Sequence, residues 1–320
     1  MSNFASLKNS SQDSLRKLTE QVGKMSAGGG ENNDKNNEQF WKPTVDKAGN
    51  GSAIIRFLPA PEGEDVPFVR YWDHGFQGPS GKWYIEKSLT SLGEKDPVAE
   101  YNSKLWKESD NDDSPQRKQA RKQKRRLHYA ANIYVVKDPA NPDNNGKVFL
   151  YDFGKKIFEK LNELMHPMDD GIEEIKPVNP FDMWSGADFY LRIRQVDGYR
   201  NYDKSSFGDS KPLLEDDDAL EAIWQKEHKL QPFLDAANFK SFAELEKRLN
   251  EVLDLNTHIN RDDNRHYGRE EAPVGKTAKP AFESKVEADE DLPWAAPAAV
   301  EPSTDEDDDM AFFKRLAEED

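Results

Sequence analysis

The apolar residues of this 320-residue chain lie mostly in short runs between about Phe40 and Leu255. None of these runs exceeds six residues, which is too short to cross a bilayer as a helix. Several runs are rich in aromatic and β-branched residues and are bounded by turn-forming residues, a pattern that predicts β-strands. These runs are Ala53–Leu58, Trp83–Glu86, Tyr129–Lys137 and Lys147–Phe153.

Alternate residues of Ala187–Val196 fall into two sets. The apolar set is Phe189, Leu191 and Ile193, and the other set is Tyr190, Arg192 and Arg194. Such alternation predicts a strand with one buried face. The tyrosine and the two arginines are then presented to solvent or to a ligand.

Two further segments carry helical periodicity. Lys155–Met165 places its apolar residues on one stripe and is followed by Pro167, and Ser241–Leu253 opens with a capping box made by Ser241 and Glu244. Irregularly spaced strands with long loops and few helices predict a mainly β fold with peripheral helices, of the α+β class. We expect a small, partly open β-barrel.

The segments on either side of this core differ in composition. Residues 1–26 have apolar residues at helical spacing and predict a short arm, and Gly28–Gly30 opens a flexible polar linker. Residues 256–320 are rich in Asp, Glu, Ala and Pro and predict a disordered tail. We therefore divide the chain at 1–38, 39–255 and 256–320. The polar N-terminus predicts no signal peptide and a soluble intracellular protein.

The net charge of −16 is distributed unevenly along the chain. Residues 283–320 contain 14 acidic and 3 basic residues and carry −11, which leaves −5 for the other 282 residues. Within the latter, Arg117–Arg126 holds seven Lys or Arg in ten positions. An acidic total argues against a nucleic-acid ligand, but a nearly balanced core with a basic stripe does not.

Three segments combine cations with aromatic rings, as a single-strand binder requires for phosphates and bases. They are the basic run, which leads into Tyr129, the polar face of Ala187–Val196, and the turn Gly198–Tyr202. The DNA-binding candidates are Arg121, Lys122, Lys124, Arg125, Arg126, Tyr129, Tyr190, Arg192, Arg194, Tyr199 and Tyr202. The pattern predicts a protein that coats single-stranded DNA without strong sequence preference.

Enzymatic signals are weak. The chain contains no cysteine, which excludes disulfides, thiolate metal sites and a cysteine nucleophile. Acidic groups that could hold Mg²⁺ in a nuclease are Asp110, Asp112, Asp113 and Glu215–Asp218, although consecutive acids in a loop point in different directions. A metal-dependent nuclease and an RNA-binding regulator are the alternatives to a non-enzymatic DNA-binding protein without cofactor or membrane partner.

Short stretches of the core also follow one another in a recognisable order. They are Ala48-Gly-Asn-Gly-Ser-Ala-Ile-Ile-Arg-Phe-Leu-Pro59, His74-Gly-Phe with Gly81-Lys-Trp-Tyr-Ile-Glu86, Ala131-Asn-Ile-Tyr-Val-Val-Lys-Asp-Pro139, Gly146-Lys-Val-Phe, Phe153-Gly-Lys-Lys-Ile157, Gln195-Val with Asn201-Tyr-Asp203, and Phe239-Lys-Ser-Phe-Ala-Glu-Leu245. Over residues 40–250 the chain thereby resembles the single-stranded DNA-binding proteins of T-even bacteriophages, the helix-destabilising proteins of phage replication, recombination and repair.

The resemblance implies three functional parts in the host cytoplasm. An N-terminal arm, here with Lys8, Arg16 and Lys17, drives cooperative self-association along DNA. An OB-fold-containing core binds single-stranded DNA, with Tyr129, Tyr151, Tyr199 and Tyr202 on DNA-facing aromatic positions and Trp106 close to another. An acidic tail contacts the phage DNA polymerase, the helicase or helicase loader, and recombination proteins. The corresponding tail residues are Asp305, Glu306, Asp307, Asp308, Asp309, Phe312 and Phe313.

One departure from the family concerns metal. The family core holds zinc with one histidine and three cysteines. His74 matches the histidine, but Ser88, Asp96 and Ala99 lie nearest the cysteine positions. Such a set does not form a zinc site, so we predict no structural zinc. The apolar side chains of Leu89, Leu92 and Val98 are expected to pack a small subcore instead.

Overall fold

The computed structural model describes residues 4–9, 39–109, 111–167, 176–196 and 198–255. Most of the expected arm, including Arg16 and Lys17, lies outside the described residues, as does the whole expected tail from Asp305 to Phe313. Within the described ranges, no helix is both long enough and apolar enough to cross a membrane.

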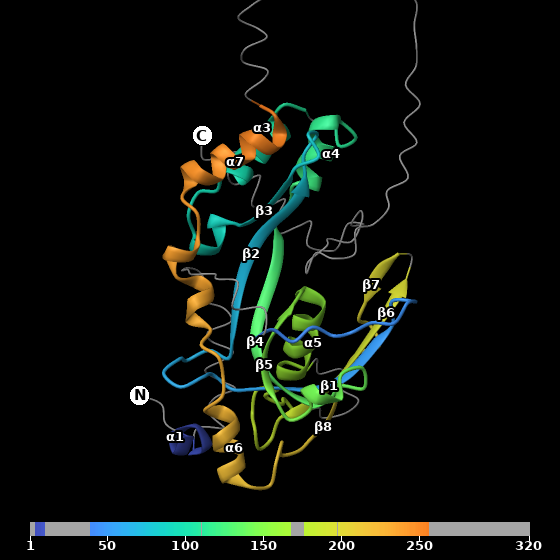
Figure 1. The fold of residues 1–320 in the computed structure, drawn as a ribbon, viewed down its shortest axis with the longest axis vertical. Helices are drawn as coiled ribbons and strands as arrows, with labels where there is room; N and C mark the ends of the chain where they lie inside the picture. The colour runs from blue at the N-terminus through green and yellow to red at the C-terminus, as the bar shows by residue number, and fades with distance from the viewer. Residues whose placement is uncertain (1–3, 10–38, 110, 168–175, 197, 256–320) are drawn as a thin grey trace, which may run out of the picture.

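An antiparallel sheet of eight strands forms the framework and curls into a half-barrel (Figure 1). The strand order is β3-β2-β4-β1-β6-β7, with β5 paired to β4 and β8 paired to β6. The strands are β1 (Gly51–Phe57), β2 (Phe68–Gln77), β3 (Trp83–Lys87), β4 (Arg126–Lys137), β5 (Val148–Phe153), β6 (Ala187–Val196), β7 (Tyr199–Asn201) and β8 (Ser206–Ser210). The predicted α+β class with a mainly β core is confirmed, while the finer OB-fold assignment stays a prediction.

The strands β2 and β4 extend beyond the rest of the sheet and carry a second group of elements (Figure 1). The helices and 3-10 turns are α1 (Phe4–Asn9), η2 (Leu89–Leu92), α3 (Pro97–Lys107), α4 (Pro115–Lys122), η3 (Pro142–Asn144), α5 (Lys155–Met165), α6 (Asp217–Trp224), η4 (Gln231–Leu234), η5 (Ala236–Asn238) and α7 (Phe242–Leu253). We call β3, η2, α3, α4 and α7 the lobe, and β1, β5, β6, β8 and α5 the body.

The body holds the larger apolar core, and aromatic rings form its centre. The Phe57 ring lies 5.4 Å from that of Phe153 and 5.7 Å from that of Phe181, centroid to centroid. Beside this cluster, the fully buried Arg56 donates through Nε to Asp188 Oδ1 at 3.0 Å. A buried guanidinium requires such a partner because an uncompensated charge in the interior is costly.

The lobe has its own, smaller core. Leu89 and Val98 are buried there, and Leu92 packs against them, as predicted for the subcore. The predicted helix at the C-terminal end of the core is also confirmed, since Ser241 and Glu244 form the capping box that begins α7. The predicted helix Lys155–Met165 corresponds to α5.

Candidate nucleic-acid interface

Trp72 lies where β2 extends beyond the body, and two arginine side chains contact its ring. Phe68, Arg70 and Trp72 alternate along β2 and share one face, and Phe68 belongs to the body core. Beyond that core, the Arg70 guanidinium lies 4.8 Å from the Trp72 ring centroid and the Arg125 guanidinium lies 4.7 Å from it. This arrangement places two cations against one aromatic ring.

A second cluster of the same composition lies between α3 and α4. Trp106 projects from α3, and the guanidinium carbons of Arg117 and Arg121 from α4 lie 4.5 Å and 5.5 Å from its ring centroid. Helix α4 begins here because Ser114 accepts a hydrogen bond from the Arg117 amide and Pro115 occupies the first helical position. We call these two groups the tryptophan–arginine clusters.

The rest of the basic run joins the two clusters. Lys122 ends α4 with an exposed side chain, and Lys124 follows the buried Gln123 with a partly exposed side chain. The run therefore passes directly from the Trp106 cluster to Arg125 in the Trp72 cluster.

Arg126 is the last residue of the basic run. It forms a bidentate pair with Asp73, with Nε–Oδ1 at 2.8 Å and Nη2–Oδ2 at 2.6 Å. The guanidinium also lies over Gly75, where a Cβ atom would come within 2.4 Å of it, so any side chain at this position would displace the pair. The charge of Arg126 is thus matched within the protein, as are those of Arg117 and Arg121 by Asp112 and that of Lys118 by Asp113.

His128 extends this pair into a network across three strands. Its ring nitrogens lie 3.0 Å from Asp152 Oδ1 and 3.1 Å from Asp73 Oδ1, and Tyr71 donates to Asp152 at 2.7 Å. Burial alone would lower the pKa of His128, but the hydrogen bonds and charges of Asp152 and Asp73 raise it to about 10. His128 is therefore a cation at neutral pH and locks β2, β4 and β5 together.

Two predicted stacking residues are buried in the body. Tyr129 is 5% exposed and stacks on Phe158 at a centroid distance of 4.0 Å, and Tyr151 is 3% exposed and packs against Trp41. Rings at such exposures offer no face to a base. The structure therefore corrects the prediction for Tyr129 and Tyr151, which are core residues.

Strand β6 has one buried face and one exposed face, as the alternation of its residues predicts. Leu191 and Ile193 are buried, whereas Arg192 and Arg194 are exposed and Tyr190 is half-buried. The Tyr190 ring covers Gly208 of β8, where a Cβ atom would lie 2.6 Å from the ring, so a glycine is needed there.

The turn after β6 carries the other two predicted rings, Tyr199 and Tyr202. Arg194 lies opposite Asn201 and Val196 lies opposite Tyr199 in the pairing of β6 with β7. Tyr199 and Tyr202 are both half-buried, and Tyr202 packs partly against the body core. The structure thus places Tyr199 on the face of Tyr190, Arg192 and Arg194, whereas Tyr202 packs on the opposite side, against the body core.

Arg70 and Trp72 are not among the residues that the sequence predicted to bind DNA. Their signal was present in the alternation of Phe68, Arg70 and Trp72, the same rule that identified the polar face of β6. The segment that contains them was not assigned as a strand, so the rule was not applied to it.

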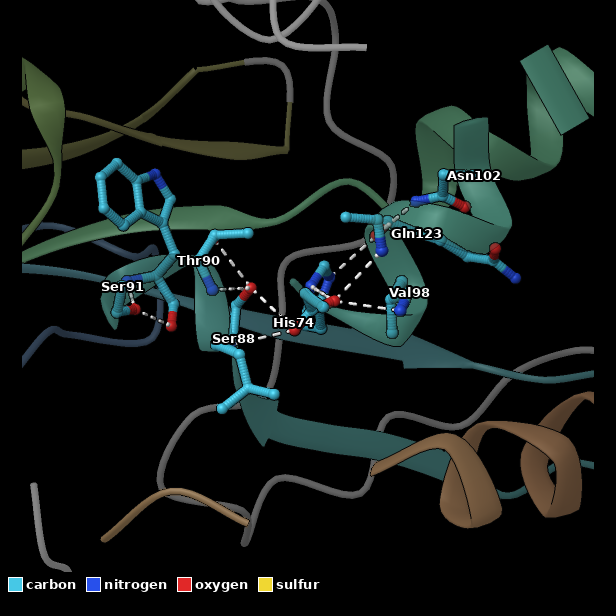
Figure 2. Close-up of polar contacts among 11 residues, drawn as sticks. His74, Ser88, Thr90, Ser91, Val98, Asn102 and Gln123 are labelled. Atoms are coloured by element: carbon cyan, nitrogen blue, oxygen red, sulfur yellow. Dashed lines mark hydrogen bonds and ion pairs between the residues drawn. The ribbon is translucent and has the colours of Figure 1, made fainter. Parts of the chain in front are cut away.

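A network of buried polar residues surrounds His74, the residue that the resemblance implies as a zinc ligand (Figure 2). His74 Nε2 lies 3.2 Å from Asp96 Oδ1, and His74 Nδ1 lies 3.1 Å from the Gln123 carbonyl oxygen. Asp96 accepts hydrogen bonds from the Ser88 hydroxyl and from the backbone amides of Leu89, Val98 and Ala99. We call this network the His74–Asp96 hub.

The hub does not fit zinc. Its carboxylate is saturated by hydrogen-bond donors, and Ala99 offers no side-chain ligand. No group of three or more potential ligand residues for a metal occurs in the described part of the chain. Burial alone would raise the pKa of Asp96, but the hydrogen bonds from His74, Ala99 and Ser88 outweigh it and lower the pKa.

The hub also lies beside the backbone of the Trp72 cluster. Ser91, in the turn that begins beside Ser88, accepts a hydrogen bond from the Trp72 amide at 2.8 Å and donates one to the Trp72 carbonyl at 3.2 Å. Gln123, whose carbonyl contacts His74, is two residues before Arg125. The backbone of the Trp72 cluster is therefore fixed by the hub from both sides.

Four of the acidic residues that could hold Mg²⁺ in a nuclease have other partners. Asp112 pairs with Arg117 and Arg121, and Asp113 pairs with Lys118. Asp216 caps α6, and Asp217 accepts a hydrogen bond from Trp184. Asp110 lies outside the described residues. These roles are structural, and they leave no converging set of acids for Mg²⁺ among the residues that the structure describes.

Comparison with known proteins decides the family. Residues 49–253 match the family described as gp32 DNA binding protein like. This chain belongs to that family. It is 38% identical to the "Single-stranded DNA-binding protein" of Enterobacteria phage T4 over 244 residues, which cover 75% of this chain and 78% of the T4 protein. It is 39% identical to the protein of the same name from Enterobacteria phage T2 over 246 residues, with the same coverage.

Proposed function

We propose that this gp32-family protein coats single-stranded DNA without strong sequence preference and without enzymatic activity, in phage DNA replication, recombination and repair. The observation that carries the proposal is the pair of tryptophan–arginine clusters, which combine cations and flat rings in the region that the basic run joins. The face of β6 with Tyr190, Arg192 and Arg194 supplies the same two kinds of side chain from the body.

The arginines account for affinity and for its dependence on salt. Each phosphate that an arginine neutralises releases counterions, so the logarithm of the affinity falls linearly with the logarithm of the salt concentration. The rings account for sequence tolerance, because every base has a face that can stack. A protein that binds only the open strand shifts the melting equilibrium of a duplex by mass action.

The other two parts of the family plan complete the proposal. The arm, with Lys8, Arg16 and Lys17, mediates cooperative self-association along DNA. The acidic tail, with Asp305–Asp309, Phe312 and Phe313, recruits the phage polymerase, the helicase or its loader, and recombination proteins. Removal of residues 283–320 should tighten DNA binding at low salt and abolish recruitment, and an unchanged affinity would contradict competition between tail and DNA.

Substitution of the clustered tryptophans tests the interface. Trp72→Ala and Trp106→Ala should each weaken binding of oligothymidylate by about 1–3 kcal/mol, the cost of one stacked base. Trp83→Ala is the matched control, because Trp83 is 39% exposed on β3, outside both clusters. Equal binding by all three variants would overturn the stacking role.

Salt dependence tests the cations separately. Arg70→Gln and Arg125→Gln should each lower the slope of log affinity against log salt by about 0.7, the value for one single-strand phosphate contact. An unchanged slope would remove these residues from the phosphate contacts.

Competition between single-stranded DNA and RNA of equal length tests the alternative that the protein is an RNA-binding regulator, since the 2′-hydroxyl distinguishes the two nucleic acids.

We also propose that the lobe folds without zinc, on the grounds that the hub carboxylate is saturated by hydrogen-bond donors. Elemental analysis of the purified protein should find no stoichiometric zinc. About one zinc per chain would contradict this proposal.

A further inference from the structure

The turn that leads into α4 places acidic side chains against a basic helix. Helices α3 and α4 pack side by side in the lobe (Figure 1), and residues 111–113 come directly before the N-cap of α4. Hydrogen bonds within the turn fix its course, since the Asn111 side chain accepts from the Asp113 amide at 3.0 Å and the Asn111 carbonyl accepts from the Ser114 amide at 3.0 Å. Within this turn, Asp112 and Asp113 pair with cations of α4.

Asp112 is the shared partner of two arginines. Its Oδ1 lies 2.5 Å from Arg117 Nη1 and 3.4 Å from Arg121 Nη2, and its carbonyl oxygen accepts from Arg121 Nη1 at 2.6 Å. The Nε of Arg117 donates to the Ser109 carbonyl at 2.6 Å, which sets the direction of that guanidinium. These are the two guanidinium groups that contact the Trp106 ring, so one carboxylate occupies the cations of that cluster.

A carboxylate between two guanidinium groups is held as a phosphate would be held. The arginine fork presents the same N–H donors to both anions. The side chain of Asp112 is 68% exposed, and exposed ion pairs contribute little in water, so this pairing can be exchanged without opening the lobe core. The carboxylate of Asp73 differs, because it is 18% exposed and is shared between Arg126 and His128.

We propose that Arg117 and Arg121 form a phosphate site that Asp112 occupies in the free protein, and that a DNA phosphate displaces Asp112 when a strand binds. This rests on the proposed function and deepens it, because it names a phosphate site and its internal competitor. The covalent link gives Asp112 a high effective concentration at the arginines, so a single phosphate in solution displaces it poorly. A strand already held at the Trp72 cluster presents its next phosphates at a comparable effective concentration.

Removal of the competing charge tests the exchange. Asp112→Asn keeps the shape of the side chain and should bind oligothymidylate about three- to tenfold more tightly than the native protein at low salt, because the phosphate no longer has to displace a carboxylate. Asp113→Asn is the matched control, since it removes the same charge from the next residue, whose partner Lys118 lies outside both tryptophan–arginine clusters. It should tighten binding less than about twofold. Quenching of the intrinsic tryptophan fluorescence measures the affinity.

A double-mutant cycle separates the contact from a general effect of charge. Arg117→Gln/Arg121→Gln removes both cations that pair with Asp112 and should weaken binding. In that background, Asp112→Asn should change the affinity less than about twofold. Urea denaturation checks that each variant folds. If the doubly substituted protein does not fold, Arg121→Gln replaces it, because that side chain is 43% exposed, and it should reduce the gain from Asp112→Asn.

Each outcome bears on the proposal. Tighter binding by Asp112→Asn that is lost without the arginines supports the exchange. Equal tightening with and without the arginines, or by Asp113→Asn, overturns it in favour of general repulsion between the turn and DNA. Unchanged or weaker binding by Asp112→Asn overturns it as well, because the carboxylate then only orders the arginines.

Failure of the proposed function has different signs. Native affinity of Arg117→Gln/Arg121→Gln would remove the Trp106 cluster from the phosphate contacts, and the exchange with it. Failure of the native protein to bind oligothymidylate would contradict the proposed function as a whole. If the arginine variant binds weakly and Asp112→Asn binds natively, only the exchange is overturned and the proposed function stands.

Discussion

The lobe and the strands that carry it each contain a histidine paired with aspartate, and the two arrangements differ in construction. His74 is 2% exposed and faces one carboxylate, Asp96, which is otherwise saturated by a hydroxyl and three backbone amides. The side chain of His128 is 26% exposed and lies between two carboxylates, Asp73 and Asp152, with Arg126 as a second cation.

The difference shows two uses of the same residue types. In the hub the carboxylate organises backbone, because it holds the start of η2 and the start of α3 in one place. In the His128 network the side chains balance two positive and two negative charges across three strands. The hub should therefore control whether the lobe forms, and the network should control how firmly its strands are joined and how this varies with pH.

The largest effect is expected when the hub loses its carboxylate. Asp96→Ala leaves one hydroxyl, three backbone amides and the His74 ring without their acceptor inside the protein. Loss of these buried hydrogen bonds should lower the free energy of unfolding by about 3–5 kcal/mol. Urea denaturation should show the loss, and weaker binding of oligothymidylate should accompany it because Ser91 and Gln123 position the Trp72 cluster.

Ser88→Ala is the control for this substitution. It removes one hydrogen bond to Asp96 and keeps the carboxylate, so it should cost only about 1 kcal/mol. Equal losses from the two variants would mean that the carboxylate does not organise the lobe.

A smaller loss is expected in the His128 network. Asp73→Ala leaves Arg126 and His128 without their shared partner, but these groups are partly exposed and water compensates in part. We expect a cost of about 2 kcal/mol by urea denaturation. Burial alone would raise the pKa of Asp73, but His128 and Arg126 lower it to about 2, so the pair persists across the neutral range. If Asp73→Ala lowered the free energy of unfolding as much as Asp96→Ala does, the hub and the His128 network would not differ in their contribution to stability.

His128 itself should determine a pH dependence of the free energy of unfolding. Its folded pKa of about 10 lies above the ordinary value of 6.5, so its contribution to stability is complete below pH 6.5 and is lost as the pH rises through 10. His128→Gln should cost about 1 kcal/mol at pH 7 and almost nothing at pH 10.5. Urea denaturation of both proteins across this range measures the difference, and a constant difference would contradict the assignment.

The smallest expected effect is an increase in the free energy of unfolding. It concerns Glu227, whose carboxyl group lacks the hydrogen-bond donors that the carboxylates of both histidine sites have. Neither side-chain oxygen of Glu227 accepts a hydrogen bond from the described residues. Burial, followed by the charge of Glu64, raises the pKa of Glu227 well above its usual range, so the folded state favours the neutral acid.

Glu227→Gln should therefore stabilise the protein by about 1 kcal/mol at pH 8. The gain should disappear as the pH falls towards 4, where the native carboxyl is neutral in both states. Glu94→Gln, at an exposed position in the lobe, is the control and should change nothing. A gain of equal size at pH 4 would contradict the titration of Glu227.

Prediction from sequence succeeded where one physical rule decided the structure. The capping box at Ser241 and the apolar stripe of Lys155–Met165 identified α7 and α5, and alternation identified β6 with its exposed Arg192 and Arg194. These elements have one buried face each, so periodicity alone specifies their orientation.

Tyr129 and Tyr151 are buried in β4 and β5, although the adjoining basic run and the resemblance predicted rings that face DNA. Strand β4 is covered on both faces over Tyr129, Ala130 and Ala131, so its sequence carries no alternation from which the exposed side could be read. The Trp106 cluster and the hub depend on contacts between segments distant in sequence, which local patterns do not specify.

The stacking of guanidinium groups on Trp72 and Trp106 has an entropic consequence. A mobile arginine loses about 0.5–1.5 kcal/mol in conformational freedom when a phosphate fixes its side chain. Arg70 and Arg125 on one ring, and Arg117 and Arg121 on the other, already rest against flat surfaces before any ligand arrives. Part of this ordering is completed when the chain folds, so each phosphate contact retains more of its favourable free energy, and DNA meets side chains that need little rearrangement.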